Sequence, residues 1–272
     1  MADVHACFAE GTPRERWLMR VSVGANLAVM LFCGAYLVFE YQESGATWFY
    51  IAGAMLAGYF VADFASGLVH WGIDTWFSAR VLGRAVAIAR EHHTHPQHIL
   101  EYGFLENSAL GSAPSAVFIG AASIVTAALQ TSVLTYGLMI VWLITSTCLF
   151  FGTSIHNLGH RRSASRLLWL LQKLHLIITP EHHWVHHRSD QVVRYCVVNG
   201  WANYVCDALR VWRGLEWLVQ SLTGAIPRRD DLEWQRHYKE SGALPGLSLS
   251  GAAAHPSDRV TMQGTNQETS AF

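Results

Sequence analysis

Long apolar stretches separated by short polar connections dominate the first half of this chain. A helix needs about 20 mostly apolar residues to cross roughly 30 Å of hydrocarbon. Between Glu106 and Arg161 there is no Asp, Glu, Lys or Arg, which leaves room for two such helices. The pattern therefore predicts four transmembrane helices, at residues 21–39, 46–71, 111–129 and 132–154.

Two later segments are apolar on one side only. Residues 167–178 are too short to cross a bilayer and are flanked by basic residues, so we expect a helix lying in the membrane interface. Residues 204–222 carry Trp212 and Trp217 among charged residues, which predicts a cap that packs on the functional site or rests on the lipid headgroups. The Gly-, Ser-, Ala- and Pro-rich end predicts a disordered tail. The expected organisation is an N-terminal segment 1–20, a four-span domain 21–239 and a tail 240–272.

Basic residues lie on alternate sides of the predicted spans. They precede the first span, occupy the connection between the second and third, and follow the fourth, whereas the other two connections carry no Lys or Arg. By the positive-inside rule, both termini and the large loop are cytoplasmic. The predicted location is a bacterial inner membrane, or the endoplasmic reticulum if the source is eukaryotic.

The overall composition is typical of a membrane protein and excludes one function class. The chain is 51% hydrophobic and only 14% charged, against about 25% charged in an average soluble domain. Its net charge of -1 lacks the basic footprint of a nucleic-acid-binding protein, so no nucleic acid is expected as a partner. The five cysteines show no CxxC spacing, which argues against a disulfide framework.

Twelve of the fifteen histidines lie between His70 and His187, each at or just beyond the end of an apolar segment. With the predicted orientation, they share the cytoplasmic face. Imidazole is the commonest protein ligand for iron, zinc and copper, and so many exceed what a single structural metal needs. We therefore expect an all-α membrane protein with four transmembrane helices and a cytoplasmic histidine-rich helical cap that holds two metal ions.

Helical spacing sorts the candidate ligands into sets. Residues four apart share one face of a helix, as His70 and Asp74 do after the second span and two histidines do after the fourth. Thr179 followed by Pro180 predicts a helix start, with two further histidine pairs about 100° apart in its first two turns. With this arrangement, the helix can provide ligands for two neighbouring metal ions. His92 and His93 in the loop and His175 on the interfacial helix could complete the coordination of the two ions. The candidates are His70, Asp74, His92, His93, His156, His160, His175, His182, His183, His186 and His187.

The type of ligand narrows the metal and the chemistry. A catalytic zinc needs three protein ligands and an open position, whereas this set holds many imidazoles, few carboxylates and no HExxH motif. Nitrogen-rich ligation suits iron, with copper or zinc open as alternatives. A di-iron centre beside a membrane can activate O₂ and remove hydrogen from a lipid chain. A membrane zinc hydrolase and a non-enzymatic metal-handling protein are the competing hypotheses. The second predicts ligands along a path through the spans, which the one-sided cluster argues against.

Five motifs resemble the Kua family of lipid desaturases, whose best-known members are the plasmanylethanolamine desaturases that form the vinyl ether bond of plasmalogens. A plant phosphatidylglycerol palmitate desaturase is a more distant member. The similarity runs from about residue 63 to residue 229. The motifs are DFASGLVHWGIDTW (63–76), REHHTHP (90–96), IHNLGH (155–160), LQKLHLIITPEHHWVHH (171–187) and NGWANY (199–204).

The resemblance implies that the candidate ligands form or support a di-iron site, with His95 and His98 left outside the set. The implied reaction removes two hydrogens from the carbons next to the ether oxygen of a 1-alkyl glycerophospholipid, using O₂ and two external electrons. Because no GxGxxG motif is present, an external donor, a b-type cytochrome or a ferredoxin, is implied on the cytoplasmic face. An ester-linked acyl chain, desaturated or hydroxylated, is the alternative substrate.

Basic residues near the histidines are candidates for binding the lipid. An apolar channel between the spans would hold the alkyl chain and leave the headgroup in the interface. Arg161, Arg162, Arg188 or Arg194 could then pair with the lipid phosphate. The same residues also fit a role as positive-inside anchors.

Overall fold

The computed structural model describes residues 12–77, 89, 92–93, 96, 98–161, 165–188 and 192–228 of the chain. All regular elements within these ranges are helical, which confirms the predicted fold class. The predicted tail, 240–272, lies outside the described residues.

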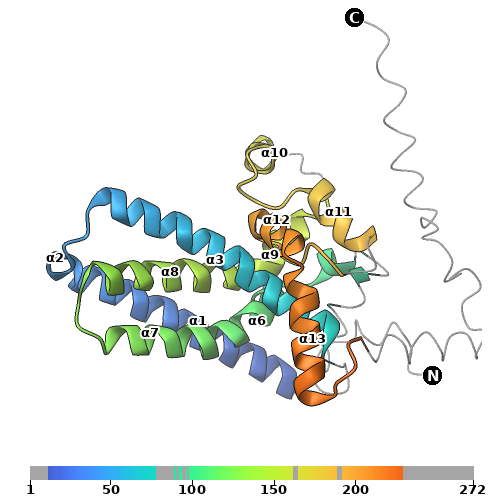
Figure 1. Ribbon diagram of the computed structural model, residues 1–272, viewed down its shortest axis with the longest axis horizontal. Coiled ribbons are helices and arrows are strands. Elements are labelled where there is room, and N and C mark those ends of the chain that lie inside the picture. The colour runs from blue at the N-terminus through green and yellow to red at the C-terminus, as the bar shows by residue number, and fades with distance from the viewer. Residues whose placement is uncertain are drawn as a thin grey trace, which may run out of the picture. The chain divides into compact units, whose positions relative to one another are not determined.

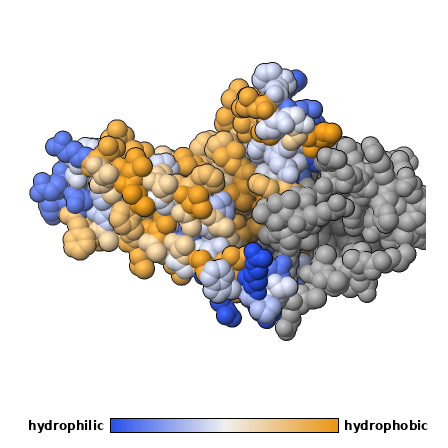
Figure 2. Space-filling model, turned by 90° about the horizontal axis from the view of Figure 1, so that it is seen from below, coloured by the Kyte–Doolittle hydropathy of each residue, from blue (hydrophilic) through white to orange (hydrophobic). Residues whose placement is uncertain are grey.

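Four helical segments have the length and hydropathy of membrane spans: α1 (Pro13–Phe39), α3 (Trp48–Thr75), Phe104–Ala127 and α8 (Val133–Phe150). The third consists of α6 (Phe104–Pro114), a π-helical turn, η3 (Ser115–Ile119), and α7 (Gly120–Ala127). The spans form a bundle, with the short α2 (Tyr41–Ser44) and the turn after α7 at one end (Figure 1). Apolar side chains gather over the middle of this bundle, with hydrophilic residues at its α2 end (Figure 2). The four predicted spans are confirmed.

Several span boundaries differ from the prediction: the second span continues to Thr75 rather than ending at residue 71, and the third begins at Phe104 rather than at residue 111. Two further boundaries differ for local reasons. Helix α1 begins at Pro13 rather than at residue 21, because Thr12 and Glu15 form a capping box and proline suits the first turn. The fourth span ends at Phe150, and a separate helix, α9 (Gly152–Leu158), follows where the sequence predicts one helix up to residue 154.

Small residues allow the spans to pack closely. A Cβ atom at Gly111 of α6 would collide with the carbonyl oxygen of Leu149 in α8, and one at Gly58 of α3 would lie 3.1 Å from Cα of Val141. Such close backbone approach is typical of membrane helices, which associate through packing and interhelical hydrogen bonds. One such bond joins α8 to α1, where the Ser146 hydroxyl donates to the side-chain oxygen of buried Asn26 at 2.7 Å.

The helices that follow the fourth span lie at the end of the bundle opposite α2 (Figure 1). They are α9, α10 (Arg166–Lys173), α11 (Pro180–Arg188), α12 (Trp201–Ala208) and α13 (Val211–Thr223), and the short η2 (His98–Glu101) precedes the third span. Helix α10 overlaps the predicted interfacial segment, residues 167–178, but ends five residues before that segment does, and it leaves Leu167 and Trp169 more than half exposed.

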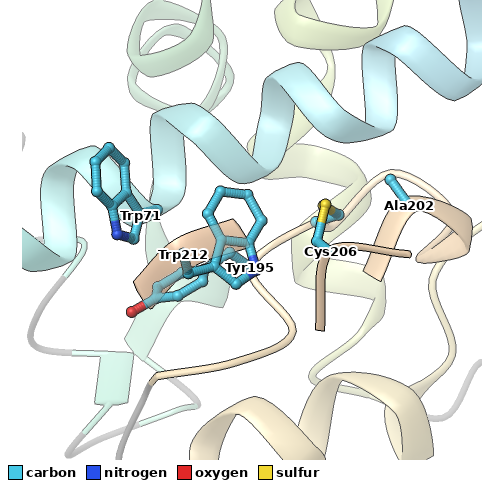
Figure 3. Close-up of a cluster of buried hydrophobic side chains, with 6 residues drawn as sticks. Trp71, Tyr195, Ala202, Cys206 and Trp212 are labelled. Atoms are coloured by element: carbon cyan, nitrogen blue, oxygen red, sulfur yellow. The ribbon is translucent and has the colours of Figure 1, made fainter. Parts of the chain in front are cut away.

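The amphipathic stretch 204–222 is divided between two helices instead of forming one element. Arg210 separates α12 from α13 with a left-handed backbone, φ 52°. The break turns Trp212 into a buried aromatic cluster with Trp71 of α3 and Tyr195 of the preceding loop, while Trp217 stays exposed (Figure 3). This cluster attaches α13 to the second span next to the histidines.

Candidate metal centre

Nine of the predicted ligands converge at one end of the bundle in two groups. Within each group, one nitrogen or oxygen atom from every side chain lies within 4.8 Å of the others. The five-histidine group consists of His92, His156, His160, His183 and His187. The four-residue group consists of His70, Asp74, His93 and His186.

Helix geometry brings these side chains together as their spacing predicts. His70 and Asp74 lie one turn apart on the last turns of α3, with Nε2 and Oδ2 3.2 Å apart. The predicted start of α11 is confirmed, because the backbone N–H of His182 donates to the Thr179 hydroxyl at 3.2 Å. His183 and His187, four apart on α11, then point into the five-histidine group. The other predicted pair does not stay together, because His186 points into the four-residue group and His182 lies outside both.

The nitrogen atoms of the five-histidine group are packed more closely than hydrogen bonding alone explains. The Nε2 atoms of His156, His160 and His183 lie 2.8, 3.0 and 3.2 Å from one another. A neutral imidazole nitrogen either donates or accepts, so in a triangle of three at least one contact joins two like atoms. A cation between them makes all three contacts favourable. The distances also match the roughly 3 Å between neighbouring ligands that each lie ~2.1 Å from one ion at right angles.

His92 gives a second indication that the site suits a cation. Its side chain is 1% exposed, yet neither ring nitrogen has a hydrogen-bond partner among the described residues. Buried polar atoms without partners are rare, and a bound ion is one recognised way in which they are satisfied. The residues present therefore fit a bound metal.

The four-residue group is arranged around a carboxylate. Oδ2 of Asp74 lies 3.4 Å from Nε2 of His93 and 3.6 Å from Nε2 of His186, in addition to its contact with His70. The His93 and His186 nitrogens are 3.2 Å apart. One carboxylate with three imidazoles is a mixed oxygen and nitrogen set of the kind that binds iron, copper or zinc.

Main-chain carbonyl groups fix the direction of two of these rings. The carbonyl oxygen of Tyr195 lies 3.0 Å from Nδ1 of His70, and that of Val193 lies 2.7 Å from Nδ1 of His186. A carbonyl only accepts hydrogen bonds, so each Nδ1 carries a proton, and in the neutral ring Nε2 is the nitrogen whose lone pair faces the group. This arrangement is the usual one behind a metal-bound histidine.

Asp63 holds the loop from which these carbonyls come. Its carboxylate is fully buried and accepts four backbone hydrogen bonds. Its Oδ1 accepts from the N–H groups of Val198, Asn199 and Gly200 at 2.9–3.0 Å, and Oδ2 accepts from Ala202 at 2.9 Å. Asp63 lies two helical turns before His70, so one face of α3 carries both the loop anchor and the ligands.

Burial keeps the histidines of the two groups that lie outside the spans in their neutral form. It lowers the pKa of His160 to about 3, and lowers the pKa of His93 to about 3 against the opposing effect of the Asp74 carboxylate. Burial and the surrounding imidazoles hold the pKa values of His92, His156 and His183 well below the usual range. Neutral imidazole is the form that binds metal, so these rings are ready to bind at neutral pH.

Two predicted ligands lie outside both groups. Nε2 of His182 accepts a hydrogen bond from the Asn203 amide at 2.9 Å and lies 3.2 Å from the Arg194 guanidinium. Burial and Arg194 lower the pKa of His182 to about 4. His175 is exposed, with a left-handed backbone at φ 53°. A ligand role for these two stays a prediction.

The basic residues proposed to bind phosphate differ in their surroundings. Arg161 and Arg188 are exposed, the latter with its guanidinium 5.9 Å from the centre of the Trp184 ring. Arg194 is paired with Asp207 at 3.0 Å. Arg162 and His95 lie outside the described residues.

The backbone carbonyls of Val193 and Tyr195 are the parts of the site that sequence reasoning misses. Every residue has a carbonyl group, so no residue type marks them. The NGWANY motif is the one sequence signal for this loop. Its Asn203 donates hydrogen bonds from the side-chain amide to His182 and to the Cys196 carbonyl.

Known proteins are similar to the region of the chain that contains the candidate ligands. A family model described as the lipid desaturase domain matches residues 59–230. Mouse (Mus musculus) plasmanylethanolamine desaturase 1 is 35% identical over 194 residues, which is 68% of this chain and 70% of the relative. Plasmanylethanolamine desaturase of Myxococcus xanthus is 34% identical over 215 residues, 75% of this chain and 74% of the relative. Chloroplastic fatty acid desaturase 4 of Arabidopsis thaliana is 27% identical over 179 residues, 63% of this chain and 52% of the relative. No solved structure matches.

Proposed function

Because the chain belongs to the lipid desaturase family, we propose that it forms the vinyl ether double bond in the sn-1 alkyl chain of an ether phospholipid. The substrate would be plasmanylethanolamine and the product plasmenylethanolamine. Similarity to two relatives named plasmanylethanolamine desaturase, at 35% and 34% identity, carries this choice of substrate. Membership of a desaturase family also disfavours the zinc hydrolase and the metal-handling protein.

We propose that the two ligand groups hold two iron ions. The five-histidine group supports one ion through its triangle of Nε2 atoms, and Asp74 with three histidines supports the other. Bound iron would supply the reduction of O₂ that accompanies loss of two hydrogens from the chain. The overall balance is R–CH₂–CH₂–O–R′ plus O₂, two electrons and two protons, giving R–CH=CH–O–R′ and two waters.

The chain's own residues have three tasks in this reaction. The carbonyls of Val193 and Tyr195 hold the proton of His186 and His70 on Nδ1, so that Nε2 is the nitrogen aimed inward to bind metal. The carboxylate of Asp74 offsets part of the positive charge of bound metal. Burial of His92, His183 and their neighbours excludes water, which strengthens each electrostatic interaction in the site.

Electrons must come from outside the chain. We propose a b-type cytochrome or a ferredoxin as donor, docking on the cytoplasmic face at the end of the bundle that carries α9 to α13. The orientation rests on the distribution of basic residues in the sequence. A bacterial inner membrane remains the proposed location, with the endoplasmic reticulum for a eukaryotic source, and residues 21–239 remain the proposed functional domain.

A second substrate is supported by the Arabidopsis relative, which is named a fatty acid desaturase. In that case the same site would act on an ester-linked acyl chain of a phospholipid. The lower identity of 27% makes it the second choice.

The test is lipid analysis of a plasmalogen-deficient host that expresses this chain and is fed 1-O-alkylglycerol. Acid-labile vinyl ether lipid should appear with the native chain and disappear with His183→Ala, whose purified protein should also lose iron. His255→Ala is the matched control, because His255 lies outside the residues matched by the family model. Iron-loaded protein that yields unsaturated ester chains without vinyl ethers would establish the second substrate instead.

A further inference from the structure

A cavity of ≈ 50 Å³ lies directly beside the candidate ligands. His70 of the four-residue group lines it together with His92 and His156 of the five-histidine group. Anything that occupies the cavity therefore lies next to both groups at once.

Most of the remaining lining is apolar and comes from three of the spans. Val69 and Ile73 belong to α3, Leu110 to α6 and Leu149 to α8. Apolar lining with few polar groups is typical of sites that bind hydrocarbon. The cavity is also far smaller than the roughly 300–1,000 Å³ of a site that encloses a whole small molecule. It suits a short segment of a chain whose remainder lies elsewhere.

Gly152, the first residue of α9, leaves this space open. It is buried, and a Cβ atom built on it would meet no atom within 4 Å. A buried residue whose side chain would touch nothing faces a void, and Gly152 lines the cavity. Gly111 lines the same cavity but cannot vary, because its Cβ atom would collide with the Leu149 carbonyl. Gly152 is therefore a lining position where side-chain size can be changed without moving the backbone.

The polar part of the lining suits a chain that carries an acceptor oxygen. Two lining residues have hydroxyl groups, and that of Ser66 is engaged, donating to the Asp63 carbonyl at 2.6 Å and accepting from Val197 N–H at 3.0 Å. Thr153 is 9% exposed, and its side chain belongs to the lining. An ether oxygen only accepts hydrogen bonds, so a hydroxyl group in the lining is a suitable donor for it.

We propose that this cavity binds the reacting end of the substrate's alkyl chain, next to both ligand groups, and that the absence of a side chain at Gly152 makes the room for it. The proposal rests on the proposed function, which supplies the alkyl chain as substrate. It adds where the chain lies and which residue controls its access.

The test is photo-crosslinking with a 1-O-alkyl glycerophosphoethanolamine that carries a diazirine in the alkyl chain near the ether oxygen. Purified metal-free protein in lipid nanodiscs should be labelled on peptides containing Leu110 or Leu149. Labelling should fall about tenfold in Gly152→Leu, as expected when burial of roughly two methylene groups is lost. Gly24→Leu is the matched control, since Gly24 is exposed on α1 and its Cβ atom also meets nothing within 4 Å.

Equal labelling of Gly152→Leu and the native chain, or labelling confined to other peptides, would overturn the proposal. If Gly152→Leu does not accumulate as folded protein, the smaller Gly152→Val and Gly152→Ala variants carry the same comparison, with a graded loss expected.

Crosslinking needs no turnover, so it separates this proposal from the proposed function. If labelling of the cavity depends on Gly152 but the protein makes no vinyl ether lipid, the binding site is supported and only the proposed reaction is contradicted. Undiminished vinyl ether formation by folded Gly152→Leu overturns the binding site and leaves the reaction in place.

Discussion

At the residue scale, Asp63 supports the site although it touches none of the candidate ligands. Its carboxylate accepts four backbone hydrogen bonds from the loop that also supplies the carbonyls behind His70 and His186. The free energy of unfolding of Asp63→Ala should fall by about 3 kcal/mol or more, because several buried N–H groups lose their partner. Iron per protein should fall with it, since the two rings lose their fixed direction.

Chemical denaturation in detergent and metal analysis of the same samples check this prediction. Ser66→Ala is the control, because it removes one hydrogen bond to the loop, from Val197 N–H, and should cost about 1 kcal/mol. Native iron content in Asp63→Ala would show that the loop does not orient the ligands.

His175 tests the boundary of the ligand set. The sequence predicts it as a ligand, whereas the structure leaves it exposed and outside both groups. We expect His175→Ala to keep its iron content and at least half of the native activity, and His187→Ala to lose both. Metal analysis and the vinyl ether assay decide, and loss of iron from His175→Ala would return this residue to the ligand set.

The residue types of the site could be predicted from the sequence, but their partners could not. Histidines at helical spacing are visible because the spacing is local, as for His156 and His160. The hydrogen bonds that Asp63 accepts come from residues more than 130 positions away, and nothing in the sequence around either partner encodes that distance. The division of the nine residues into two groups also depends on contacts between distant parts of the chain. The ligands come from α3, residues 92–93, the region of α9, and α11.

At the element scale, the start of α11 sets the direction of the histidines that it carries. Thr179→Ala removes the hydroxyl that accepts from His182 N–H, and such a loss at a helix start costs about 1 kcal/mol. We expect a lower unfolding temperature and weaker metal binding, measured by competition with a chelator. Thr179→Ser keeps the acceptor and should behave like the native chain. Equal metal affinity in the alanine variant would show that packing alone holds α11.

Elements with a long periodic pattern could be predicted well, and breaks within them could not. The four spans follow from length and hydropathy. The separation of α12 from α13 follows from a left-handed backbone at Arg210, a conformation that costs a non-glycine residue about 1–2 kcal/mol. Arginine carries no signal for that conformation. Burial of Trp212 offsets this cost. That burial depends on the packing of α13 against α3, which the local sequence does not reveal.

At the scale of the whole molecule, the buried imidazoles make the metal-free protein sensitive to acid. The pKa values of His93 and His160, about 3 when folded, lie below the ordinary value of about 6.5. The unfolded chain therefore binds more protons between these values, and stability present above pH ~6.5 is lost as the pH falls toward 3. Between pH 6.5 and 5, each such group lowers the free energy of unfolding by about 2 kcal/mol.

Thermal unfolding of chelator-treated protein between pH 7.5 and 5 measures this effect. The double variant His93→Phe and His160→Phe removes two of the titrating groups and should show a shallower pH dependence. A melting temperature that does not change over this range would mean that the rings are exposed to water in the metal-free state.

The carbonyl groups behind His70 and His186 have one more consequence. Exchanging the side chain at position 193 or 195 leaves the peptide oxygen in place, so a systematic alanine scan would pass over two of the contacts on which the centre depends. Homologous chains are free to differ at position 193 and still orient the same imidazole. The contacts can be reached only by altering the backbone itself, for example by an ester in place of the amide or by a proline that bends the loop.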